Sequence, residues 1–357
     1  MNKKFKFGDS EKFNLLRLGV AISIALAITF AIIFAVSEQP KEVIKILLTG
    51  PFASKRHFFN VLEMMVPLMF TGLALSLVYK SGNFSMIADG ALYIGAILAS
   101  FIAAKIQLPS GVHPIVAILV AGVAGGIIGS IPALLKVRYK ANELVTSLML
   151  NYVFFYLGLF LVNTYFIDRK ASNFASLKFQ STAGLGNVIE GTRLHYGFFI
   201  AIGVCILLHL FLTRTKWGYE IKVVGSNIEF AKFSGINTAK VIIYTQCIAG
   251  VVAAMGGAIE KLGMYQRFQW ADAPSYAWDG VVIAILAGNN PKYVPVAAFF
   301  LSYIRISADI MSRKTDVDNE LVAIIQGIII LLITAERFLY VIKQRKESKK
   351  ALASYSA

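Results

Sequence analysis

The stretch from His113 to Leu135, HPIVAILVAGVAGGIIGSIPALL, contains no Asp, Glu, Lys or Arg. A helix needs about 20 apolar residues to cross the hydrocarbon core of a bilayer, and this stretch is long enough. Its small residues include Gly122 and Gly126, whose i,i+4 spacing lets membrane helices approach closely. The stretch therefore predicts a helix that crosses a membrane and packs against other helices.

The rest of the chain has the same character. Of its 357 residues, 57% are hydrophobic and only 15% are charged, and the mean hydropathy is +0.66. Soluble domains average about 45–50% apolar and about 25% charged residues, so an ordinary soluble enzyme is excluded. The sequence predicts an all-α polytopic membrane protein with about ten transmembrane helices. The predicted spans are Leu15–Val36, Val61–Tyr79, Met86–Ala104, His113–Leu135, Glu143–Asn163, Tyr196–Leu212, Val241–Ala258, Tyr276–Ala287, Val294–Met311 and Leu321–Leu339.

The 35 Lys and Arg residues outnumber the 20 Asp and Glu residues, for a net charge of +15. A surplus of this size often indicates nucleic-acid binding in a soluble protein, whereas in a membrane protein basic residues gather on cytoplasmic segments. With both termini in the cytoplasm, the densest basic clusters fall inside, including residues 136–140 and the loop from Arg214 to Lys240. We therefore expect cytoplasmic N and C termini and no nucleic-acid partner.

Short matches recur in the same order in the two halves of the chain. An odd number of spans separates the copies, so the second copy is inverted across the membrane, as is common in transporters. The chain is then a single transmembrane permease domain, residues 1–357, with a first four-helix repeat at 61–163 and a second, inverted repeat at 241–340. The alternative is that Gly- and Leu-rich helices resemble one another by composition. The matches include Lys80-Ser81-Gly82-Asn83-Phe84 with Lys261-Leu262-Gly263-Met264-Tyr265, Asp89-Gly90 with Asp279-Gly280, and Asn142-Glu143-Leu144-Val145 with Asn319-Glu320-Leu321-Val322.

Two inverted halves suggest alternating access, in which a central site opens to either side of the membrane. Helix breaks at matching positions of the two halves mark such a site. The breaks are predicted at Asp89-Gly90 and Asp279-Gly280, and the short eighth span, which ends before Asn289, is typical of a bent or re-entrant segment. The substrate pathway is expected beside these residues.

Charged side chains within spans are costly to insert and should face the interior of the bundle. Arg305 and Asp309 have the spacing to neutralise each other on one helix, and Glu143 is expected to begin a helix as a first-turn acid. Amide side chains within spans favour interhelical hydrogen bonds. The charged residues are Glu63, Asp89, Glu143, Asp279, Arg305 and Asp309, and the amides are Asn151, Asn163, Gln246 and Gln326.

Aromatic residues gather on the outer side between the seventh and eighth predicted spans. Such a group is typical of a belt at the membrane interface, and the other hypothesis is a docking surface for an extracytoplasmic partner. Its members are Tyr265, Phe268, Trp270, Tyr276 and Trp278.

The sequence lacks the motifs of ATP hydrolysis and of catalysis. It has no GxxxxGK[ST] phosphate loop, no HExxH and no GxSxG, and its 4 histidines are scattered. Cys205 and Cys247 lie in apolar stretches without a CxxC pattern, so neither a disulfide nor a zinc site is indicated. We expect no catalytic residue, no metal site and no cofactor bound by this chain.

The inside loop at residues 213–240 reads TKWGYEIKVVGSNIEFAKFSGI from Thr215 to Ile236. Asn227 is suited to cap a short amphipathic helix that ends at Gly235, and such a helix taken alone could lie on a membrane surface. The pattern TxWG…GxN…AxxxG[IV], however, resembles the cytoplasmic coupling loop in permease subunits of ABC importers. The superfamily concerned serves ribose-type sugars, branched-chain amino acids and nucleosides.

The resemblance extends over nearly the whole chain, and three further segments look most like the nucleoside-type branch. They are Gly50-Pro51-Phe52-Ala53-Ser54, Pro67-Leu68…Thr71-Gly72-Leu73-Ala74, and Asn142-Glu143-Leu144-Val145-Thr146-Ser147-Leu148-Met149-Leu150-Asn151-Tyr152. One stretch departs from the family, which has an NIGxEGQ-like sequence where this chain has SMIADGA from Ser85 to Ala91. Asp89 takes the place of the family's glutamate there, and this departure bears on the substrate more than on the fold.

This resemblance implies a permease subunit, not an enzyme, of an ABC importer that moves nucleosides across the bacterial cytoplasmic (inner) membrane. Its partners would be a homologous second permease subunit, an ATPase subunit that uses the ATP, an extracytoplasmic substrate-binding lipoprotein and membrane lipid. The variant Gly225→Trp is expected to fold and insert but to uncouple transport from ATP hydrolysis. The residues that match the motif are predicted to contact the ATPase or to shape that contact: Gly218, Gly225, Asn227, Ala231 and Gly235.

Two other functions stay open at this point. One is a simple-sugar ABC permease, and the other is an ion-coupled secondary transporter that would use the charges within the spans. Aromatic stacking and amide hydrogen bonds suit a nucleobase and a ribose. The candidate residues of the substrate pathway are Asp89, Tyr93, Asn151, Trp278, Asp279 and Asn289.

Overall fold

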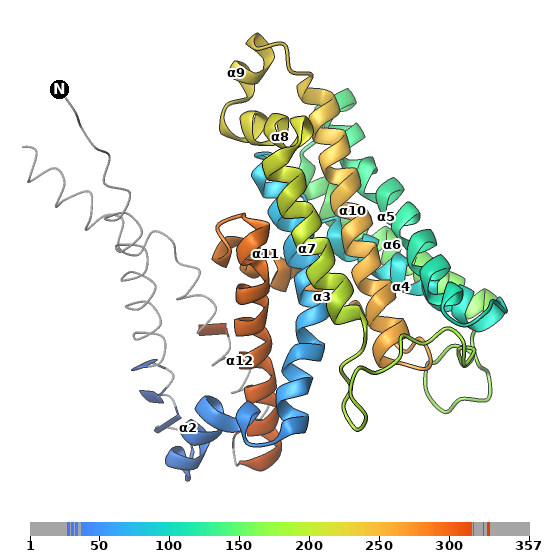
Figure 1. Cartoon of the computed structure of the whole chain (residues 1–357), viewed down its shortest axis with the longest axis vertical. Coiled ribbons are helices and arrows are strands. Elements are labelled where there is room, and N and C mark those ends of the chain that lie inside the picture. The colour runs from blue at the N-terminus through green and yellow to red at the C-terminus, as the bar shows by residue number, and fades with distance from the viewer. Residues whose placement is uncertain are drawn as a thin grey trace, which may run out of the picture. The chain divides into compact units, whose positions relative to one another are not determined.

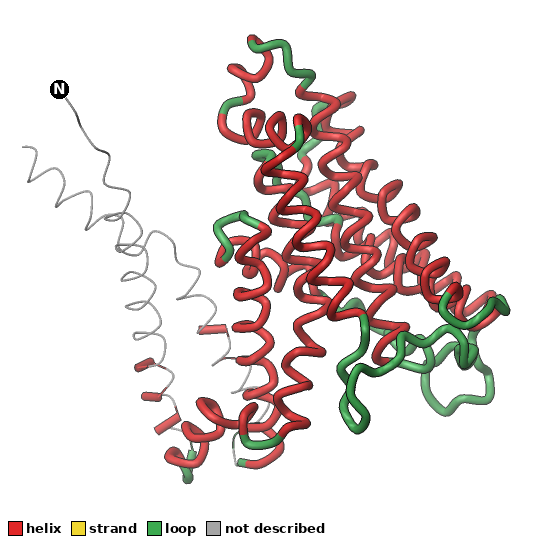
Figure 2. Tube along the Cα trace, in the orientation of Figure 1, coloured by secondary structure: helices red, strands yellow, loops and turns green. Residues whose placement is uncertain are grey.

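The computed structural model describes residues 37–315 without a gap, and also residues 27–28, 30–31, 33–34, 317, 324 and 327–328. The regular elements of this part are helices joined by loops and turns (Figure 2). The chain divides into two compact units, one of residues 54–303 and one of residues 1–53 with 304–357. Most of the first predicted span, most of the tenth, the match at Asn319–Val322 and both termini lie outside the described residues.

The larger unit holds most of the helices (Figure 1). They are α3 (Lys55–Lys80), α4 (Ala88–Lys105), α5 (Val112–Tyr139), α6 (Glu143–Tyr165), α7 (Gly197–Arg214), α8 (Lys216–Ser226), α9 (Ile228–Phe233), α10 (Thr238–Met264), α11 (Tyr276–Leu286), the 3₁₀ turn η2 (Pro291–Tyr293) and the first half of α12 (Val294–Lys314). The smaller unit holds α2 (Pro40–Thr49), the 3₁₀ turn η1 (Gly50–Phe52) and the second half of α12.

Among the described residues, 7 helices are long and apolar enough to cross a membrane. They are α3, α4, α5, α6, α7, α10 and the continuous stretch from η2 through α12, each at the place of a predicted span. The eighth predicted span is α11, which has 11 residues. At 1.5 Å per residue its length is about half the thickness of the hydrocarbon core, so α11 is too short to cross it. The polytopic, all-helical class is thus as expected.

Helix α10 packs against α3, α4 and α5 and is the central helix of the larger unit. Glycines make this close packing possible, because a Cβ atom on Gly250 would fall on the carbonyl oxygen of Gly125 in α5. A Cβ atom on Gly257 would likewise fall on the carbonyl oxygen of Leu92 in α4. The close helix packing predicted from small residues is confirmed.

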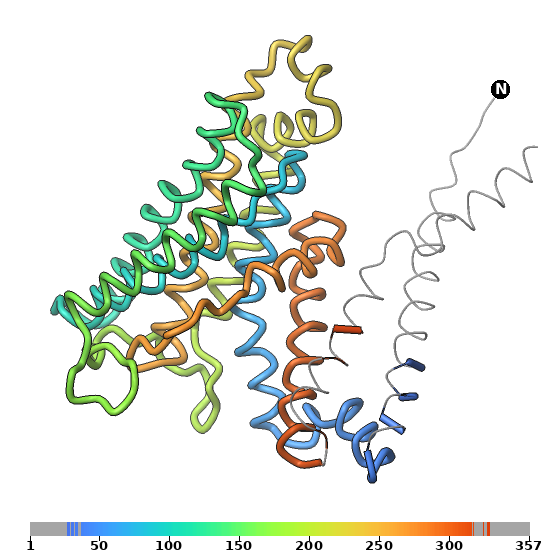
Figure 3. The backbone as a smooth tube through the Cα atoms, turned by 180° about the vertical axis from the view of Figure 1, so that it is seen from behind, coloured from blue at the N-terminus to red at the C-terminus, as the bar shows by residue number. Residues whose placement is uncertain are grey.

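The two ends of the larger unit differ in structure. Helices α8 and α9 lie at one end of the bundle, and the long connection between α6 and α7, residues 166–196, lies at the other (Figures 1 and 3). The segment 265–275, between α10 and α11, also begins at that second end and is hydrogen-bonded there, because Ser176 N–H donates to Phe268 O at 2.9 Å. We call the first the loop end and the second the outer end.

The acidic residues predicted within spans of the larger unit are mostly buried. Glu63, Glu143 and Asp279 expose between 2% and 7% of their surface, as expected for charges that face the interior of a bundle. In the smaller unit, Asp309 accepts hydrogen bonds from Nε and Nη2 of Arg313 at 3.0 and 2.9 Å. Asp309 is therefore paired with Arg313, one helical turn after it. The pairing of Asp309 with Arg305 stays a prediction.

Candidate functional site

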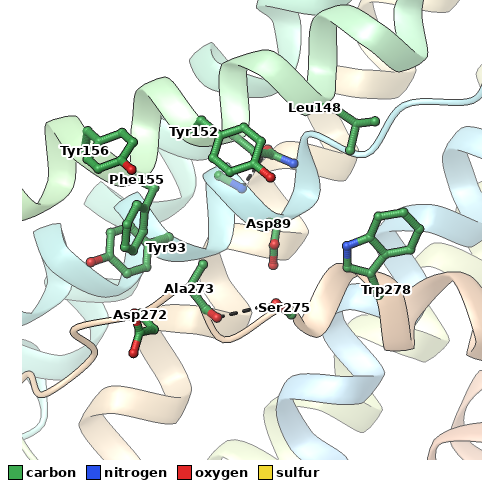
Figure 4. A pocket seen from close by; sticks show the side chains of 12 residues that line it. Asp89, Tyr93, Leu148, Tyr152, Phe155, Tyr156, Asp272, Ala273, Ser275 and Trp278 are labelled. Atoms are coloured by element: carbon green, nitrogen blue, oxygen red, sulfur yellow. Dashed lines mark hydrogen bonds between the residues drawn. The ribbon is translucent and has the colours of Figure 1, made fainter. Parts of the chain in front are cut away.

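A cavity of about 260 Å³ opens between α4, α6 and the start of α11 (Figure 4). Asp89, in the first turn of α4, lies between Tyr152 of α6 and the Ser275–Trp278 end of α11. The lining residues are Asp89, Gly90 and Tyr93 from α4, Leu148, Asn151, Tyr152, Phe155 and Tyr156 from α6, Asp272, Ala273 and Ser275 from the segment that leads into α11, and Trp278 from α11.

The cavity combines aromatic rings with two carboxyl groups. Tyr93, Tyr152, Phe155, Tyr156 and Trp278 supply the rings. The acids are Asp89 and Asp272, and no Lys, Arg or His is among the described lining residues. Such a site suits a flat or ring-shaped molecule that has hydrogen-bond donors and no negative charge.

Asp89 bonds the start of α4 to the start of α11. Its Oδ1 accepts a hydrogen bond from the backbone N–H of Ala277 at 3.3 Å, in the first turn of α11. A carboxyl group is favourable there because the first N–H groups of a helix have no partner within the helix. The break at Asp89-Gly90 and the start of α11 therefore meet at the cavity, although they are far apart in the sequence. The break predicted at Asp279-Gly280 is wrong, because these residues lie inside α11, which begins at Tyr276.

Four of the six predicted pathway residues line this one cavity. They are Asp89, Tyr93, Asn151 and Trp278. Asp279 is 7% exposed and is not among the lining residues, and neither is Asn289, which follows α11 in the left-handed backbone conformation with φ 54°.

Asn151 has a structural task within the cavity wall. Its Oδ1 accepts from the Gly90 N–H at 3.0 Å, and its Nδ2 donates to the Met86 carbonyl at 2.8 Å. Both ends of the amide thus fix the start of α4, and the predicted interhelical hydrogen bonding is confirmed for this residue. Gln246 likewise bonds across helices, to the Oε1 of Glu143.

The α6 face of the cavity and the turn before α11 are not among the residues predicted from the sequence. Leu148 lies one turn before Asn151, and Tyr152, Phe155 and Tyr156 lie within about one turn after it, so the helical period around Asn151 would have found them. Asp272, Ala273 and Ser275 belong to a polar stretch before α11, and no sequence pattern places that stretch beside α4.

The wall that contains Asp272 is held in place by a buried lysine. Lys261 is fully buried, and its Nζ lies 3.4 Å from the ring centre of Trp270 and 4.0 Å from that of Tyr265. An ammonium group over an aromatic face is attracted by the ring quadrupole, most strongly when it is desolvated. Tyr93 of the cavity donates a hydrogen bond to the Trp270 carbonyl at 3.2 Å.

The aromatic group on the outer side is therefore mainly internal. Phe268 is fully buried and Tyr276 is 9% exposed, so the predicted interfacial belt is wrong for these residues. They pack around Lys261 and Trp270, with ring contacts to Trp270 at 5.8 and 6.2 Å. Trp278 is 58% exposed and lies on the cavity wall.

An ion pair also holds this segment at the outer end. Arg267 Nη1 lies 2.8 Å from Asp168 Oδ2. The backbone N–H of Lys170 and the Arg267 guanidinium hold the pKa of Asp168 below its usual value. The pair ties the wall segment to the long connection between α6 and α7.

The loop at residues 213–240 forms two short helices. Asn227 caps α9, since its Oδ1 accepts from the Phe230 N–H at 3.0 Å, and Gly235 follows the helix with φ 77°. This predicted cap is confirmed. Residues 216–226 form α8, which the sequence analysis had not separated, and Thr215 caps it by accepting from the Gly218 N–H at 3.0 Å.

The five predicted coupling residues mostly shape this loop from inside. A Cβ atom on Gly218 would fall on the Phe211 carbonyl oxygen, and one on Gly225 would fall on the Lys80 carbonyl oxygen. Ala231 is fully buried. The expectation that Gly225→Trp leaves folding intact is therefore corrected, because α8 meets the backbone after α3 at that position with no room for a side chain.

The exposed surface of this loop is aromatic and apolar. Phe233 is 90% exposed, and Trp217, Tyr219, Phe230 and Ile228 are 42–62% exposed. An apolar group of this kind beside basic residues at the end of a helical bundle is typical of a protein contact surface.

The apolar helices are those of a multi-pass membrane protein, with a cavity lined by aromatic rings and two acids and with exposed aromatic side chains at its loop end. The chain belongs to the family described as branched-chain amino acid transport system / permease component, whose model matches residues 57–334.

Relatives of known name are similar over most of the chain. The glucose ABC transporter permease protein TsgB13 of Haloferax volcanii is 30% identical, covering 85% of this chain and 83% of that protein. The guanosine ABC transporter permease protein NupP of Bacillus subtilis is 27% identical, covering 81% and 84%. The nucleoside ABC transporter permease protein NupB of Lactococcus lactis is 25% identical, covering 85% and 86%.

Proposed function

We propose that this chain is the membrane-spanning permease subunit of an ATP-driven importer that moves nucleosides into the cell, and that the cavity beside Asp89 is on their path. The observation that supports this most is the composition of the cavity, in which five aromatic side chains surround two acids. Two of the similar proteins are named as guanosine and nucleoside permeases, which agrees with this substrate class.

The chemistry of a nucleoside fits this cavity. A nucleobase has a flat face that stacks on aromatic rings, and the ribose hydroxyls and base N–H groups donate hydrogen bonds that Asp89 and Asp272 can accept. The cavity volume of about 260 Å³ is close to the lower bound of about 300 Å³ for ligand sites. Two acids and no described cation on the wall disfavour a phosphorylated compound.

The loop end is proposed to meet the ATPase. The exposed aromatic side chains of α8 and α9 would contact that subunit, while the buried residues Gly218, Gly225 and Ala231 keep the loop in shape. The further partners proposed are a homologous second permease and an extracytoplasmic binding lipoprotein, in the inner membrane of a bacterium. ATP would be bound by the ATPase and not by this chain.

A simple sugar is the second candidate substrate. The similarity to the glucose permease TsgB13, at 30% identity, is the observation that favours it. A sugar ring also packs on aromatic faces and donates hydroxyl hydrogens to carboxylates, so the same cavity accommodates both classes.

The test is uptake by the complete complex, reconstituted in lipid vesicles with the proposed ATPase, second permease and binding protein. We expect labelled guanosine to enter only when ATP is supplied, and unlabelled guanosine to compete better than glucose. Better competition by glucose would select the sugar importer. Uptake without ATP that stops when proton and sodium gradients are collapsed would contradict both and favour an ion-coupled transporter.

A further inference from the structure

The connection between α3 and α4 joins the loop end to the cavity. The beginning of this connection packs against the end of α8, since a Cβ atom on Gly82 would lie 3.1 Å from the Cα of Gly225. It leads directly into the first turn of α4, where Asp89 and Gly90 line the cavity. Residues 80–90, of which 81–87 are irregular, therefore run from the proposed ATPase contact to the proposed substrate path. We call them segment 80–90.

Helix α6 is bonded to this segment along one face. Glu143, Ser147 and Asn151 recur every four residues and so lie on the same side of the helix. Ser147 Oγ accepts from the Met86 N–H at 2.9 Å, and Asn151 bonds to the Met86 carbonyl and the Gly90 N–H. Ser147 and Asn151 bond to segment 80–90 directly, and Glu143 reaches it through Lys136, which donates to Asn83. We call Glu143, Ser147 and Asn151, with these bonds, the α6 seam.

At Glu143, the first residue of α6, the seam ends in an ion pair whose acid is buried and whose lysine is 32% exposed. Lys136 Nζ, at the end of α5, lies 2.5 Å from Glu143 Oε2 and donates to Asn83 Oδ1 at 2.6 Å. The Glu143 side chain is 6% exposed, and Gln246 of α10 donates to its other oxygen. The ion pair thus connects α5, α6, α10 and segment 80–90 at one point.

We propose that the α6 seam, together with Lys136, makes α6 and segment 80–90 move as one body, so that displacement of α8 at Gly225 reaches the cavity. This inference rests on the proposed function, in which an ATPase acts on the α8–α9 loop. The seam residues are positioning residues: in this proposal they bind neither ATP nor the ATPase subunit, and they act by holding α6 against segment 80–90. They also fall within the 142–152 stretch that looked most specific in the sequence, and the seam supplies a physical reason for those residue types.

The seam could instead be needed only to satisfy the irregular backbone of segment 80–90, since buried N–H and carbonyl groups require partners. The two roles predict different measurements. If the role is purely structural, a seam variant gives less folded complex, and the complex that does fold hydrolyses the same number of ATP molecules per substrate molecule transported. A transmitting role raises that ratio while the affinity for substrate stays the same.

The experiment measures uptake and ATP hydrolysis together in the reconstituted complex. In Ser147→Ala, which removes one hydrogen bond across the seam, we expect the ATP hydrolysed per substrate to rise about fivefold, with KM unchanged. Ser130→Ala is the matched control, because its hydroxyl donates only within α5, to the Gly126 carbonyl at 2.7 Å. An unchanged ratio in Ser147→Ala, or an equal rise in the control, would overturn the proposal.

The ion pair gives a second test. We expect Lys136→Met also to raise the ATP hydrolysed per substrate transported. The exchanged pair, Lys136→Glu with Glu143→Lys, is expected to bring this ratio back towards the wild-type value. The Oε1 of Gln246 has no hydrogen-bond partner among the described residues and can accept from the lysine introduced at 143. Arg313→Met, which breaks the exposed pair with Asp309, is the control. Failure of the exchanged pair to recover any coupling, with complex assembled normally, would count against the proposal.

A cross-link keeps the test decisive if these variants fold poorly. The variant carries Met86→Cys and Ser147→Cys, with Cys205 and Cys247 replaced by alanine. Oxidation is expected to form a disulfide between the two new cysteines and to leave the uptake rate unchanged. A disulfide between two elements that move together does not restrain their motion. Loss of uptake on oxidation, or no link at all, would refute the seam as one moving body. A wild-type complex without ATP-dependent uptake would instead refute the proposed function.

Discussion

Trp278 lies 58% exposed on the wall of the cavity, at the start of α11. A base stacked on one aromatic ring is held by roughly 1–3 kcal/mol. In Trp278→Ala we therefore expect the KM for uptake to rise about tenfold, while ATP-dependent transport continues. Uptake kinetics in vesicles measure this. The control is Phe199→Ala, at an aromatic residue of α7 that is 55% exposed and does not line the cavity, and its KM should be unchanged. Equal changes of KM in both variants would show that Trp278 does not contact the substrate.

His195 precedes α7 at the outer end and is fully buried. Its Nδ1 accepts from the Gly197 N–H at 3.1 Å, and burial lowers the pKa of its side chain from 6.5 to about 4. The unfolded chain then binds a proton below pH 6.5 that the folded chain does not bind. Stability is therefore unaffected above pH 6.5 and falls by about 1.4 kcal/mol per pH unit between pH 6.5 and 4.

This dependence is measured as the thermal midpoint of the purified protein from pH 7.5 to 4.5. The slope below pH 6.5 should be smaller in His195→Gln than in the wild type. His209→Gln, in α7, controls for the loss of a histidine as such. Identical slopes in wild type and His195→Gln would show that another group causes the acid sensitivity.

At the scale of the elements, the contact of α5 with α10 depends on glycine. A Cβ atom on Gly250 would overlap the Gly125 carbonyl oxygen, and backbone has no rotamer with which to move away. We expect Gly250→Ala to destabilise the protein by about 1–3 kcal/mol, the usual cost of overpacking. Gly203→Ala in α7 is the control, since its Cβ would meet nothing within 4 Å and alanine favours a helix. The measurement is the thermal unfolding midpoint of each variant in detergent. If Gly250→Ala is as stable as Gly203→Ala, then α5 and α10 can separate enough to accommodate the methyl group.

At the scale of the whole molecule, the loop end and the outer end have different surfaces. Phe233 of α9 is 90% exposed, and we expect it to be a central contact residue for a partner at the loop end. In Phe233→Ala we expect the purified permease to bind its ATPase about 10- to 30-fold more weakly, as is typical of a central aromatic contact. Tyr196→Ala, 54% exposed and beside the 166–196 connection, should bind normally. Unchanged affinity in Phe233→Ala, measured by titration in detergent, would move the contact away from α9.

The sequence predicted the helices well wherever the signal is local. Apolar length located α3 to α7, α10, α11 and α12, and the predicted cap at Asn227 follows from a side chain that bonds to the N–H group three residues ahead. The predicted ends agree less closely, as for α5, which continues to Tyr139 through the basic residues after Leu135. Charged residues at a helix end interrupt the hydropathy but not the helix, so composition alone ends the span too early.

The candidate site was predicted only in part, for a physical reason. Asp89, Tyr93, Asn151 and Trp278 were chosen because they adjoin predicted helix breaks, and they meet in one cavity. Asp272 could not be found in this way, because its place beside α4 depends on how the 265–275 segment packs around the buried Lys261.

The amino-acid sequence by itself thus determined the membrane class, most of the spans and the helix cap at Asn227, since hydropathy and capping act over a few neighbouring residues. Only the tertiary structure decided that two carboxyl groups and five rings share a cavity, that Gly225 packs on the backbone after α3, and that the α6 seam bonds to segment 80–90. These features arise from contacts between residues distant in the chain, whose positions depend on close packing of α3, α4, α5, α6 and α10 against one another.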